Sequence, residues 1–553
     1  MASEVLPHGP AATDAIRWRT VRPLRTVLAI ARTLTSAIRL LEATPVFQHD
    51  PRVQLVFTVD PGSRFSTGVH DLLHRLQAQV VLWAEVSGLD CDLVITASEN
   101  AGFDRLGQAP ILVLPHGIGF HKFVPASDRD GTRLSGLVNP ELVRAKQIIH
   151  LVTHPDQEAQ LRAASPATAG RVVVGGDLSL DGLLAGEPFR DDYRRRIGVR
   201  TGQRLVVISS TWGEESVLGG FPTLPDRLLA ELPADQYRVA MILHPNAWTW
   251  HGRWQVRQWL DNAVRGGLAL IPPNEGWHAT VIAADAVIGD HGSVGLYSAI
   301  TDRPFLLAAF GSEVVPGTPL ADFGRFAQRL DHGAGLQEQV DKAIATQQAG
   351  QFRSLAERLF SLPGEAARTL RGICYDLMDL SEPDIDLVLD AVPAPVAEQR
   401  PVHSFEVLGE LLGQDTVMLH RFPASVRHHR PPAPPEVLRH LAVDTEERSL
   451  RLYWNASVIV CADTSTRAAG NDRVDDLQLR FPGCAVTAVA TVDGCLTRIR
   501  DWGTMLVTTE EGAPDPMVAA SALHVLWCAD QLQPGRFVVR DGVREHRLIL
   551  TPG

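Results

Sequence analysis

The sequence predicts an α/β protein with two Rossmann-like domains, followed by a smaller C-terminal α+β domain. Short apolar runs of strand length alternate with helical patterns over 21–186, and the same alternation restarts over 187–389. A Pro/Ala-rich linker at 390–404 then leads to residues 405–553, where the pattern changes. Apolar strands that alternate with helices are typical of parallel sheets covered on both faces. We therefore expect one parallel sheet in each of the first two domains.

Length, charge and cysteine usage narrow the classes of protein and partner. A chain of 553 residues is too long for one ordinary domain, and its 45% hydrophobic content predicts packed globular domains. The net charge of −12 argues against nucleic acid or another polyanion as the partner. The six cysteines include no CxxC pair, which fits a reduced, cytoplasmic chain. The N-terminal arm, 1–20, does not resemble a signal peptide, and no apolar run reaches the ~20 residues of a transmembrane helix.

The first domain, 21–186, is expected to contain buried strands joined by helices. The strand runs are 26–31, 52–60, 91–98, 110–117, 147–154 and 171–176. The helical patterns between them are 36–44, 68–79 and 156–164.

The second domain repeats this plan and adds a return helix. Its strand runs are 204–213, 237–246, 268–273, 285–289 and 304–310, and its helical patterns are 224–232, 252–267, 276–284 and 293–300. A helical stretch at 365–380 is expected to pack back across the first domain. Two Rossmann-like domains joined in this way suggest the two-lobed GT-B architecture, with a ligand cleft between the lobes.

The C-terminal domain, 405–553, is expected to be of antiparallel type. Two hairpins are predicted to turn at Asp493-Gly494 and Asp541-Gly542, with a helix at 517–532 between them. We find no chemical constellation there, so we expect an interaction or structural module that binds a protein partner or forms a dimer. The pair His428-His429 lies in a proline-rich loop, where metal binding is the less frequent outcome, and no metal site is predicted.

Four polar clusters close predicted strands in the first two domains. They are His116-Gly117 with Lys122, then 209–213, 244–246 and 290–293. The carboxyl ends of parallel strands form the ligand crevice of an open α/β sheet, so these clusters are expected to face the cleft. Hydroxyls and backbone amides suit phosphate oxygens, and a histidine can act as a base near neutral pH. One strand-end histidine is more often structural, but four clusters on the same edge favour a ligand site.

The order of these clusters resembles that of the CDP-glycerol glycerophosphotransferase family. LPHGIGFHK (114–122) is similar to a first-lobe His-Gly segment followed by lysine, and GGDLSLDGLL (175–184) is a looser counterpart of a further motif. VVISSTWG (206–213) is similar to a strand that ends in Pro-Thr-Trp, and ILHPN (242–246) to a later His-Pro. GDHGSVGLYSAITDRPFLL (289–307) resembles an Asp-Tyr-Ser-Ser turn followed by a Lys-Pro strand. The resemblance implies a GT-B fold and transfer of an alditol phosphate from a CDP-activated donor to a hydroxyl.

The resemblance also implies roles for particular residues. His116 would deprotonate the acceptor hydroxyl, and His244 would contact the donor phosphates. The donor and its nucleotide would lie against Ser210, Thr211, Trp212, Asn246, Asp290, His291, Gly292 and Ser293. Possible acceptor contacts are Lys122, together with Asp60 and Arg64, which follow a first-domain strand. No tightly bound cofactor is expected, because the CDP-linked or UDP-linked donor is itself a substrate, and no metal is expected, because the sequence shows no cluster of metal ligands.

Two other interpretations stay open at this point. UDP-sugar-dependent glycosyltransferases and epimerases have the same GT-B fold. If this chain is one of them, Gly292 and Ser293 would hold the sugar diphosphate. A non-catalytic GT-B scaffold is the third interpretation, with the C-terminal domain recruiting a partner. Within the first interpretation, the acidic charge favours a small or uncharged acceptor over a polyphosphate chain.

Overall fold

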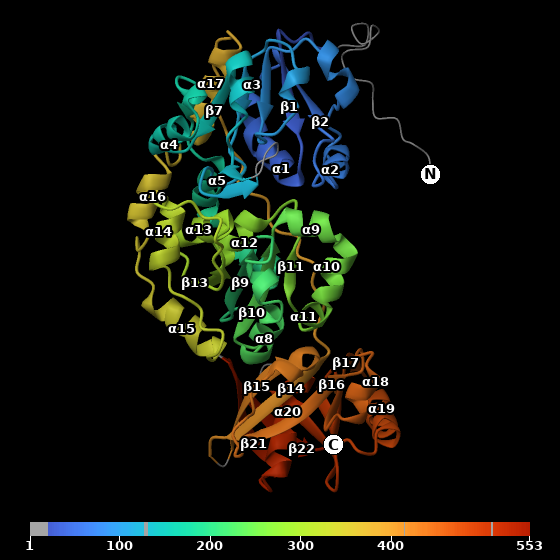
Figure 1. Ribbon diagram of the computed structural model, residues 1–553. Helices are drawn as coiled ribbons and strands as arrows, with labels where there is room; N and C mark the ends of the chain where they lie inside the picture. The colour runs from blue at the N-terminus through green and yellow to red at the C-terminus, as the bar shows by residue number, and fades with distance from the viewer. Residues whose placement is uncertain (1–19, 126–130, 414, 510–512, 543) are drawn as a thin grey trace.

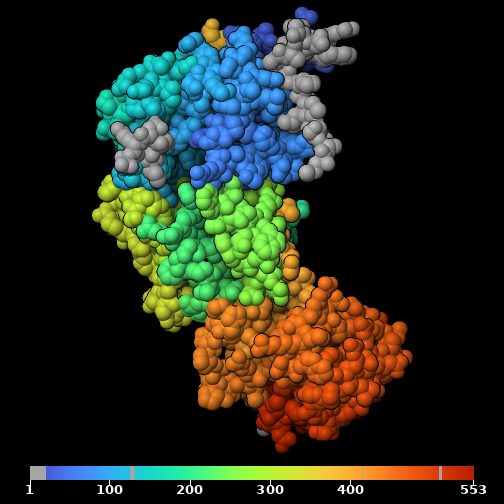
Figure 2. All heavy atoms as spheres, turned by 45° about the vertical axis from the view of Figure 1, so that its right-hand side comes forward, coloured from blue at the N-terminus to red at the C-terminus, as the bar shows by residue number. Residues whose placement is uncertain are grey.

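The computed structural model describes residues 20–125, 131–413, 415–509, 513–542 and 544–553. The predicted N-terminal arm therefore lies outside the described residues, apart from its last residue. Two α/β lobes and a barrel follow one another along the molecule (Figure 1). The second lobe lies in the middle and touches both neighbours (Figure 2). Among the described residues, no helix combines the length and the apolar character needed to cross a membrane.

The first lobe contains a parallel sheet in the order β2-β1-β3-β4-β7-β8. The predicted strands and parallel sheet are confirmed. The strands are β1 (Arg25–Ala31), β2 (Val53–Val59), β3 (Leu93–Thr96), β4 (Ile111–Val113), β7 (Ile148–Val152) and β8 (Val172–Val174). The helices are α1 (Leu34–Ala43), α2 (Val69–Arg75), α3 (Pro140–Ala145), α4 (Asp156–Ala164) and α5 (Leu178–Gly186). A short hairpin, β5 (Phe123–Pro125) and β6 (Thr132–Leu134), follows the His116 segment.

The second lobe contains a parallel sheet in the order β11-β10-β9-β12-β13, as predicted. The strands are β9 (Arg204–Ser210), β10 (Tyr237–Leu243), β11 (Ala269–Ile271), β12 (Ala286–Gly289) and β13 (Phe305–Leu307). The helices are α6 (Arg190–Ile197), α7 (Val217–Gly220), α8 (Leu224–Glu231), α9 (Pro245–His251), α10 (Arg253–Trp259), α11 (Asp261–Arg265), α12 (Trp277–Ala283), α13 (Ser293–Ile300), α14 (Pro319–Phe326), α15 (Leu336–Thr346) and α16 (Arg353–Leu359). The stretch read as one helix, 252–267, is thus two helices with a break at Leu260.

Two segments of the chain run from one domain to another. Helix α17 (Ala366–Leu377) leaves the second lobe and packs on the first, where Leu370 and Tyr375 are part of the core. The Tyr375 hydroxyl donates a hydrogen bond of 2.8 Å to Asp50, beside the start of β2. The stretch read as a linker then runs back along the second lobe, where Glu398 pairs with Leu270 in a short backbone bridge. The first lobe is therefore built from two separate parts of the sequence.

The C-terminal domain is a closed barrel around a helix, and its strands run in mixed directions, whereas we expected antiparallel strands. Its strands run in the order β14-β15-β21-β22-β20-β19-β18-β17-β16, and β14 closes on β16. Both predicted hairpins, β18–β19 and β21–β22, are confirmed. The pairs β15–β21, β16–β17 and β17–β18 are parallel. The strands are β14 (Ser404–Leu411), β15 (Thr416–Pro423), β16 (Leu438–Asp444), β17 (Val458–Ser465), β18 (Val486–Thr491), β19 (Gly494–Ile499), β20 (Gly503–Thr509), β21 (Gly535–Asp541) and β22 (Arg544–Pro552).

The helix α20 (Pro516–Cys528) lies inside this barrel (Figure 1). Every residue from Met517 to Leu526 is buried, and the helix contacts strands from β14 round to β21. Two further helices, α18 (Leu450–Trp454) and α19 (Arg467–Arg480), belong to the same domain. A helix apolar on every side is stable only where protein surrounds it.

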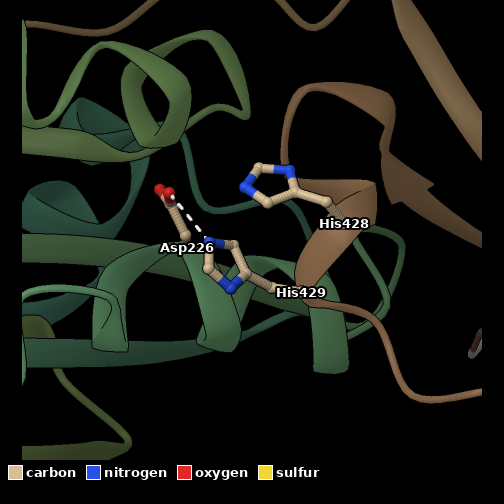
Figure 3. Close-up of side chains that lie close together, drawn as sticks. All are labelled: Asp226, His428 and His429. Atoms are coloured by element: carbon tan, nitrogen blue, oxygen red, sulfur yellow. Dashed lines mark ion pairs between the residues drawn. The ribbon is translucent and has the colours of Figure 1, made fainter.

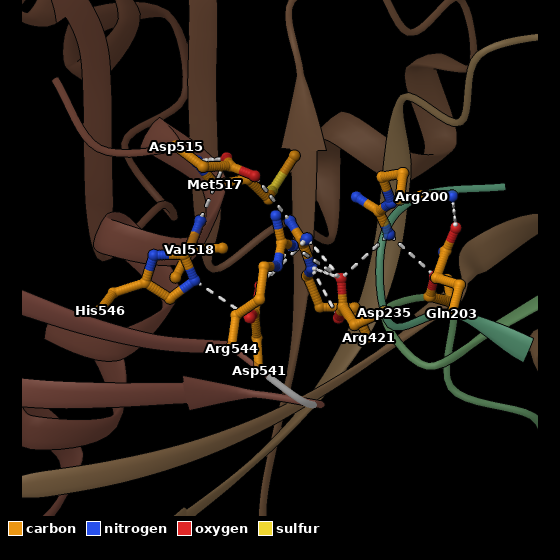
Figure 4. Close-up of polar contacts among 11 residues, drawn as sticks. Arg200, Gln203, Asp235, Arg421, Asp515, Met517, Val518, Asp541, Arg544 and His546 are labelled. Atoms are coloured by element: carbon orange, nitrogen blue, oxygen red, sulfur yellow. Dashed lines mark hydrogen bonds and ion pairs between the residues drawn. The ribbon is translucent and has the colours of Figure 1, made fainter. Parts of the chain in front are cut away.

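The barrel docks on the second lobe through a buried charge cluster (Figure 4). Arg421 of β15 donates from Nη2 (2.5 Å) and from Nε (3.0 and 3.2 Å) to the carboxylate of Asp235, from the barrel to the loop before β10. Asp515 and Asp541 of the barrel lie 3.2 and 3.7 Å from the same guanidinium. Burial opposes the charge of Arg421, but the facing carboxylates raise its pKa further above its usual range. Arg421 is thus a buried cation shared by carboxylates of both domains, and the more exposed Arg200 and Arg544 lie 3.6 and 4.0 Å from Asp235.

Candidate functional site

A cleft of about 1100 Å³ lies between the two lobes and is lined by the ends of their strands. Of the residues predicted for the site, those that line it are His116, Lys122, Ser210, Thr211, Trp212, His244, Asn246, His291, Gly292, Ser293 and Arg64. Asp290 and Asp60 are buried behind the lining residues. The sheets therefore bring together residues that are up to 229 positions apart, from Arg64 to Ser293.

Asp290 and Asp60 hold the loops of the site in place. The carboxylate of Asp290 accepts backbone hydrogen bonds from Thr211 (2.8 Å), Val217 (3.0 Å) and Gly292 (3.0 Å). Its oxygens are thus engaged in joining the loop after β9 to the turn after β12. Asp60 does the same in the first lobe, accepting from Gly62 at 2.8 Å and from Gly102 at 3.0 Å.

His116 projects into the cleft from the loop after β4, and Glu99 lies behind it. The Nδ1 atom of His116 is 3.9 Å from the carboxylate of Glu99. Arg133 fixes that carboxylate with a hydrogen bond of 3.1 Å. Burial raises the pKa of Glu99, but the nearby His116 and Arg133 outweigh it and lower the pKa. The carboxylate of Glu99 therefore lies beside the ring of His116 at ion-pair distance.

Glu99 is a site residue that the sequence interpretation missed. It directly follows the strand run at 91–98, and it lines the same cleft as the four polar clusters. The signal that placed the histidines there could therefore have found Glu99 as well.

His244 faces the cleft from the second lobe as a neutral ring. Its Nδ1 accepts a hydrogen bond of 3.1 Å from the backbone N–H of Asn246, which assigns the proton to Nε2. Burial lowers the pKa of His244 to about 3, and the cation Lys122 adds to the shift. His244 is therefore a hydrogen-bond donor through Nε2 across the neutral pH range.

A second polar cluster, centred on His291, joins the two lobes. His291 accepts a hydrogen bond of 2.9 Å from the backbone N–H of Gly311 at Nδ1, and its Nε2 lies 2.6 Å from Glu313. Lys122 of the first lobe lies 3.5 Å from the same carboxylate. Burial raises the pKa of Glu313, but the hydrogen bond with His291 outweighs it and brings the pKa down to about 2. His291 and Lys122 are thus held by Glu313 at the cleft wall.

The lobes touch directly at the loop that carries His116. The Ser293 hydroxyl accepts a hydrogen bond of 3.1 Å from the backbone N–H of Ile118. Gly117 has a φ of +146°, and a Cβ there would come within 2.7 Å of the same hydroxyl. A side chain at position 117 would therefore hold the lobes apart.

A short backbone ladder continues this contact. The N–H of Phe123 donates to the carbonyl of Glu313 at 2.7 Å, and the N–H of Val315 donates to the carbonyl of His121 at 2.9 Å. Lys122 and Val314 pair between these two bonds as an antiparallel bridge. We call segments 121–123 and 313–315 the inter-lobe ladder.

A buried polar network at the rear of the cleft also joins the lobes. Arg39 of α1 donates to Glu42 at 2.6 Å and to the hydroxyl of Tyr297 of α13 at 3.0 Å. Tyr297 in turn donates to Asp177 at 2.7 Å. Arg39, Glu42 and Tyr297 line the cleft, and nothing in their sequence context marked them as site residues.

Aromatic rings stand on both sides of the cleft. Phe65 of the first lobe lies 5.6 Å from Trp212 and 5.9 Å from Trp250 of the second lobe, measured between ring centroids. Trp212 is 48% exposed, so a face is free for a planar ligand. Trp248, in contrast, is buried in the core of the second lobe.

The buried ring of His121 predicts acid sensitivity. Neither of its ring nitrogens has a hydrogen-bond partner among the described residues, and burial lowers its pKa to about 4. An unfolded histidine takes up its proton near pH ~6.5, so between about pH 6.5 and pH 4 the unfolded state binds more protons. Stability then falls as the pH falls. We expect the urea midpoint to drop from about pH 7.5 to about pH 5, and to drop less in His121→Phe.

The control for this experiment is His70→Phe, on the exposed side of α2. This variant should keep the wild-type pH dependence. An unchanged pH dependence in His121→Phe would contradict the assignment to His121.

No family model matches this sequence, and no curated protein matches it. Solved structures do match. The wall teichoic acid polymerase TagF is 14% identical, with 65% of this chain and 90% of that chain covered at a TM-score of 0.43. The UDP-GlcNAc 2-epimerase from Neisseria meningitidis, bound to UDP-GlcNAc, is 12% identical, with 64% and 100% covered at a TM-score of 0.39. The S. aureus MnaA–UDP structure is 12% identical, with 65% and 98% covered at a TM-score of 0.39.

Proposed function

We propose that this chain is a nucleotide-donor transferase of the GT-B type that moves an alditol-phosphate or related group from a CDP-activated donor to an acceptor hydroxyl. The observation that carries the proposal is the opposition of two histidines across one cleft. His116, with Glu99 beside it, lies on the first lobe, and His244, a neutral hydrogen-bond donor, lies on the second. His116 is suited to removing the acceptor proton, and His244 is suited to donating a hydrogen bond to a phosphate oxygen.

The proposed reaction is an in-line displacement at the phosphorus that carries the alditol. The acceptor oxygen forms the new O–P bond as its proton passes to His116. The bond from that phosphorus to the bridging oxygen breaks, and the electron pair leaves with CMP. His244 donates from Nε2 to a phosphate oxygen as charge grows on it. Such a displacement needs little covalent chemistry from the protein, so positioning and charge stabilisation dominate.

The second lobe supplies the proposed donor pocket. Ser210, Thr211 and the turn at Gly292-Ser293 line the cleft beside His244. Trp212 offers an exposed ring face, which suits stacking on the nucleotide base. The first lobe would then hold the acceptor, near Lys122 and Arg64.

A thermal-shift screen against CDP, CMP, UDP, UMP, GDP and ADP tests the donor class. A ligand present at about 100 times its dissociation constant adds about 2.7 kcal/mol to the free energy of unfolding, which raises the melting temperature measurably. We expect cytidine nucleotides to give the largest shift. The shift should disappear in His244→Ala and persist in His251→Ala, which changes an exposed histidine at the other end of α9.

The other outcomes are equally informative. A shift confined to uridine nucleotides would replace the CDP proposal with UDP-sugar transfer or epimerisation. No shift with any nucleotide would favour the non-catalytic scaffold.

A further inference from the structure

Three potential metal ligands meet where the barrel rests on the second lobe. Asp226 belongs to α8, and His428 and His429 belong to the 3₁₀ turn η7 (Ala424–His429). One ligand atom from each side chain lies within 4.8 Å of the other two. Figure 3 shows the carboxylate and both imidazole rings turned toward a common point. None of the three residues lines the cleft between the lobes.

We propose that Asp226, His428 and His429 form a binding site for a divalent metal ion, Zn²⁺ being the best fit, that ties the barrel to the second lobe. Two imidazole nitrogens and one carboxylate oxygen are a donor set that Zn²⁺ uses, with water in the fourth position. Ligands at about 2.0–2.2 Å from one tetrahedral ion are about 3.3–3.6 Å apart. The three ligand atoms lie within 4.8 Å of one another, so the side chains need to close by at most about 1.5 Å, which rotation about their own bonds provides.

The backbone that carries the two histidines is already fixed. Val426 of the same turn is fully buried in the core of the second lobe. The Ser425 hydroxyl donates to the carbonyl of Asn262 at 2.9 Å, and Arg430 donates to the carbonyl of Ala230 at 3.4 Å. Binding therefore orders side chains only, and a pre-organised site loses less conformational entropy on binding.

The local charges are compatible with a cation. His429 and Asp226 already lie 3.5 Å apart, and burial lowers the pKa of His429, which favours the neutral ring that a metal requires. Arg227, whose charge acts on His429, is engaged elsewhere, through Glu231 at 2.9 Å and the carbonyl of His332 at 2.7 Å. His428 is exposed, so an ion can reach the site from solvent.

The test is titration of the full chain, without a histidine tag and stripped with EDTA, with ZnCl₂ and with CoCl₂. We expect one ion per chain, visible absorption bands for Co²⁺, and a higher melting temperature in Zn²⁺. Asp226→Asn, His428→Gln and His429→Gln should each weaken binding at least about tenfold, the loss that even an outer-shell change causes. Hydrogen exchange of residues 424–429 should slow when Zn²⁺ is added.

His154→Gln is the matched control, because its imidazole lies 3.6 Å from Asp156 without a third ligand in the described residues. This variant should bind like the wild type. No uptake by the wild type, or binding that survives all three variants, would overturn the site. Binding that leaves exchange at 424–429 unchanged would overturn its role in the dock.

Discussion

Replacing His116 with alanine is expected to lower turnover by about 10²–10⁴-fold, the usual contribution of a positioned general base. The ring projects from the loop after β4 and its side chain is 41% exposed, so its loss should leave the fold intact. The measurement is nucleotide release from the donor that the thermal-shift screen identifies. The melting temperature of the variant should equal that of the wild type.

Two further variants test whether the loss of turnover comes from the role of His116 as a base. His70→Ala, on the exposed side of α2, should keep full activity. Glu99→Gln should lower kcat more than it raises KM and should alter the pH profile, because Glu99 acts through His116 as a positioning residue. Full activity in His116→Ala would contradict the proposed mechanism. If nucleotides still raise the melting temperature of that variant, the proposed donor site stands independently of His116.

Replacing Arg421 with methionine is expected to cost about 3–5 kcal/mol, because the buried carboxylate of Asp235 then keeps only the more distant and half-exposed Arg200 and Arg544, at 3.6 and 4.0 Å. Asp235 is 3% exposed and Asp541 is fully buried, and Arg421 faces both. The chain has several domains, so the loss should appear in the transition that separates the barrel from the second lobe, and not as a uniform shift. Urea unfolding with limited proteolysis of 378–403 would detect it.

The control is Arg498→Met, which removes an ion pair with Asp475 in the barrel. The two side chains are 41% and 54% exposed, and exposed pairs contribute less than about 1 kcal/mol. The double variant Arg421→Met with Asp235→Asn should recover part of the loss, because it removes the buried charge of Asp235 that has lost its nearest cation. An Arg421→Met chain that unfolds like the wild type would contradict the buried dock.

The parallel sheets could be predicted from the sequence because their strands are buried on both faces. Runs such as 26–31 and 204–210 are almost continuously apolar, and polar residues follow where each strand ends. That second signal also found His116 and His244, since the strand end fixes the edge on which a residue lies. Pairings across the lobes, such as Arg39 with Tyr297, depend on the relative placement of two domains and leave no local pattern.

The barrel shows the same limit. The helix at 517–532 and both hairpins were predictable from local periodicity and turn residues. The closure of β14 on β16 and the parallel pairs depend on long-range pairing, which no short pattern records. The uninterrupted burial from Met517 to Leu526 matches a segment without a polar face, a signal that could have placed the helix inside the domain.

The inter-lobe ladder joins the two walls of the cleft through main-chain groups. Its two hydrogen bonds join backbone groups of Phe123 to Glu313 and of Val315 to His121, so substitution of a side chain in the loop removes neither bond. Any movement that separates the lobes at the His116 loop must break both bonds together. The two amide protons are then exposed to solvent at the same moment, which makes them built-in reporters of how often the two walls of the site part.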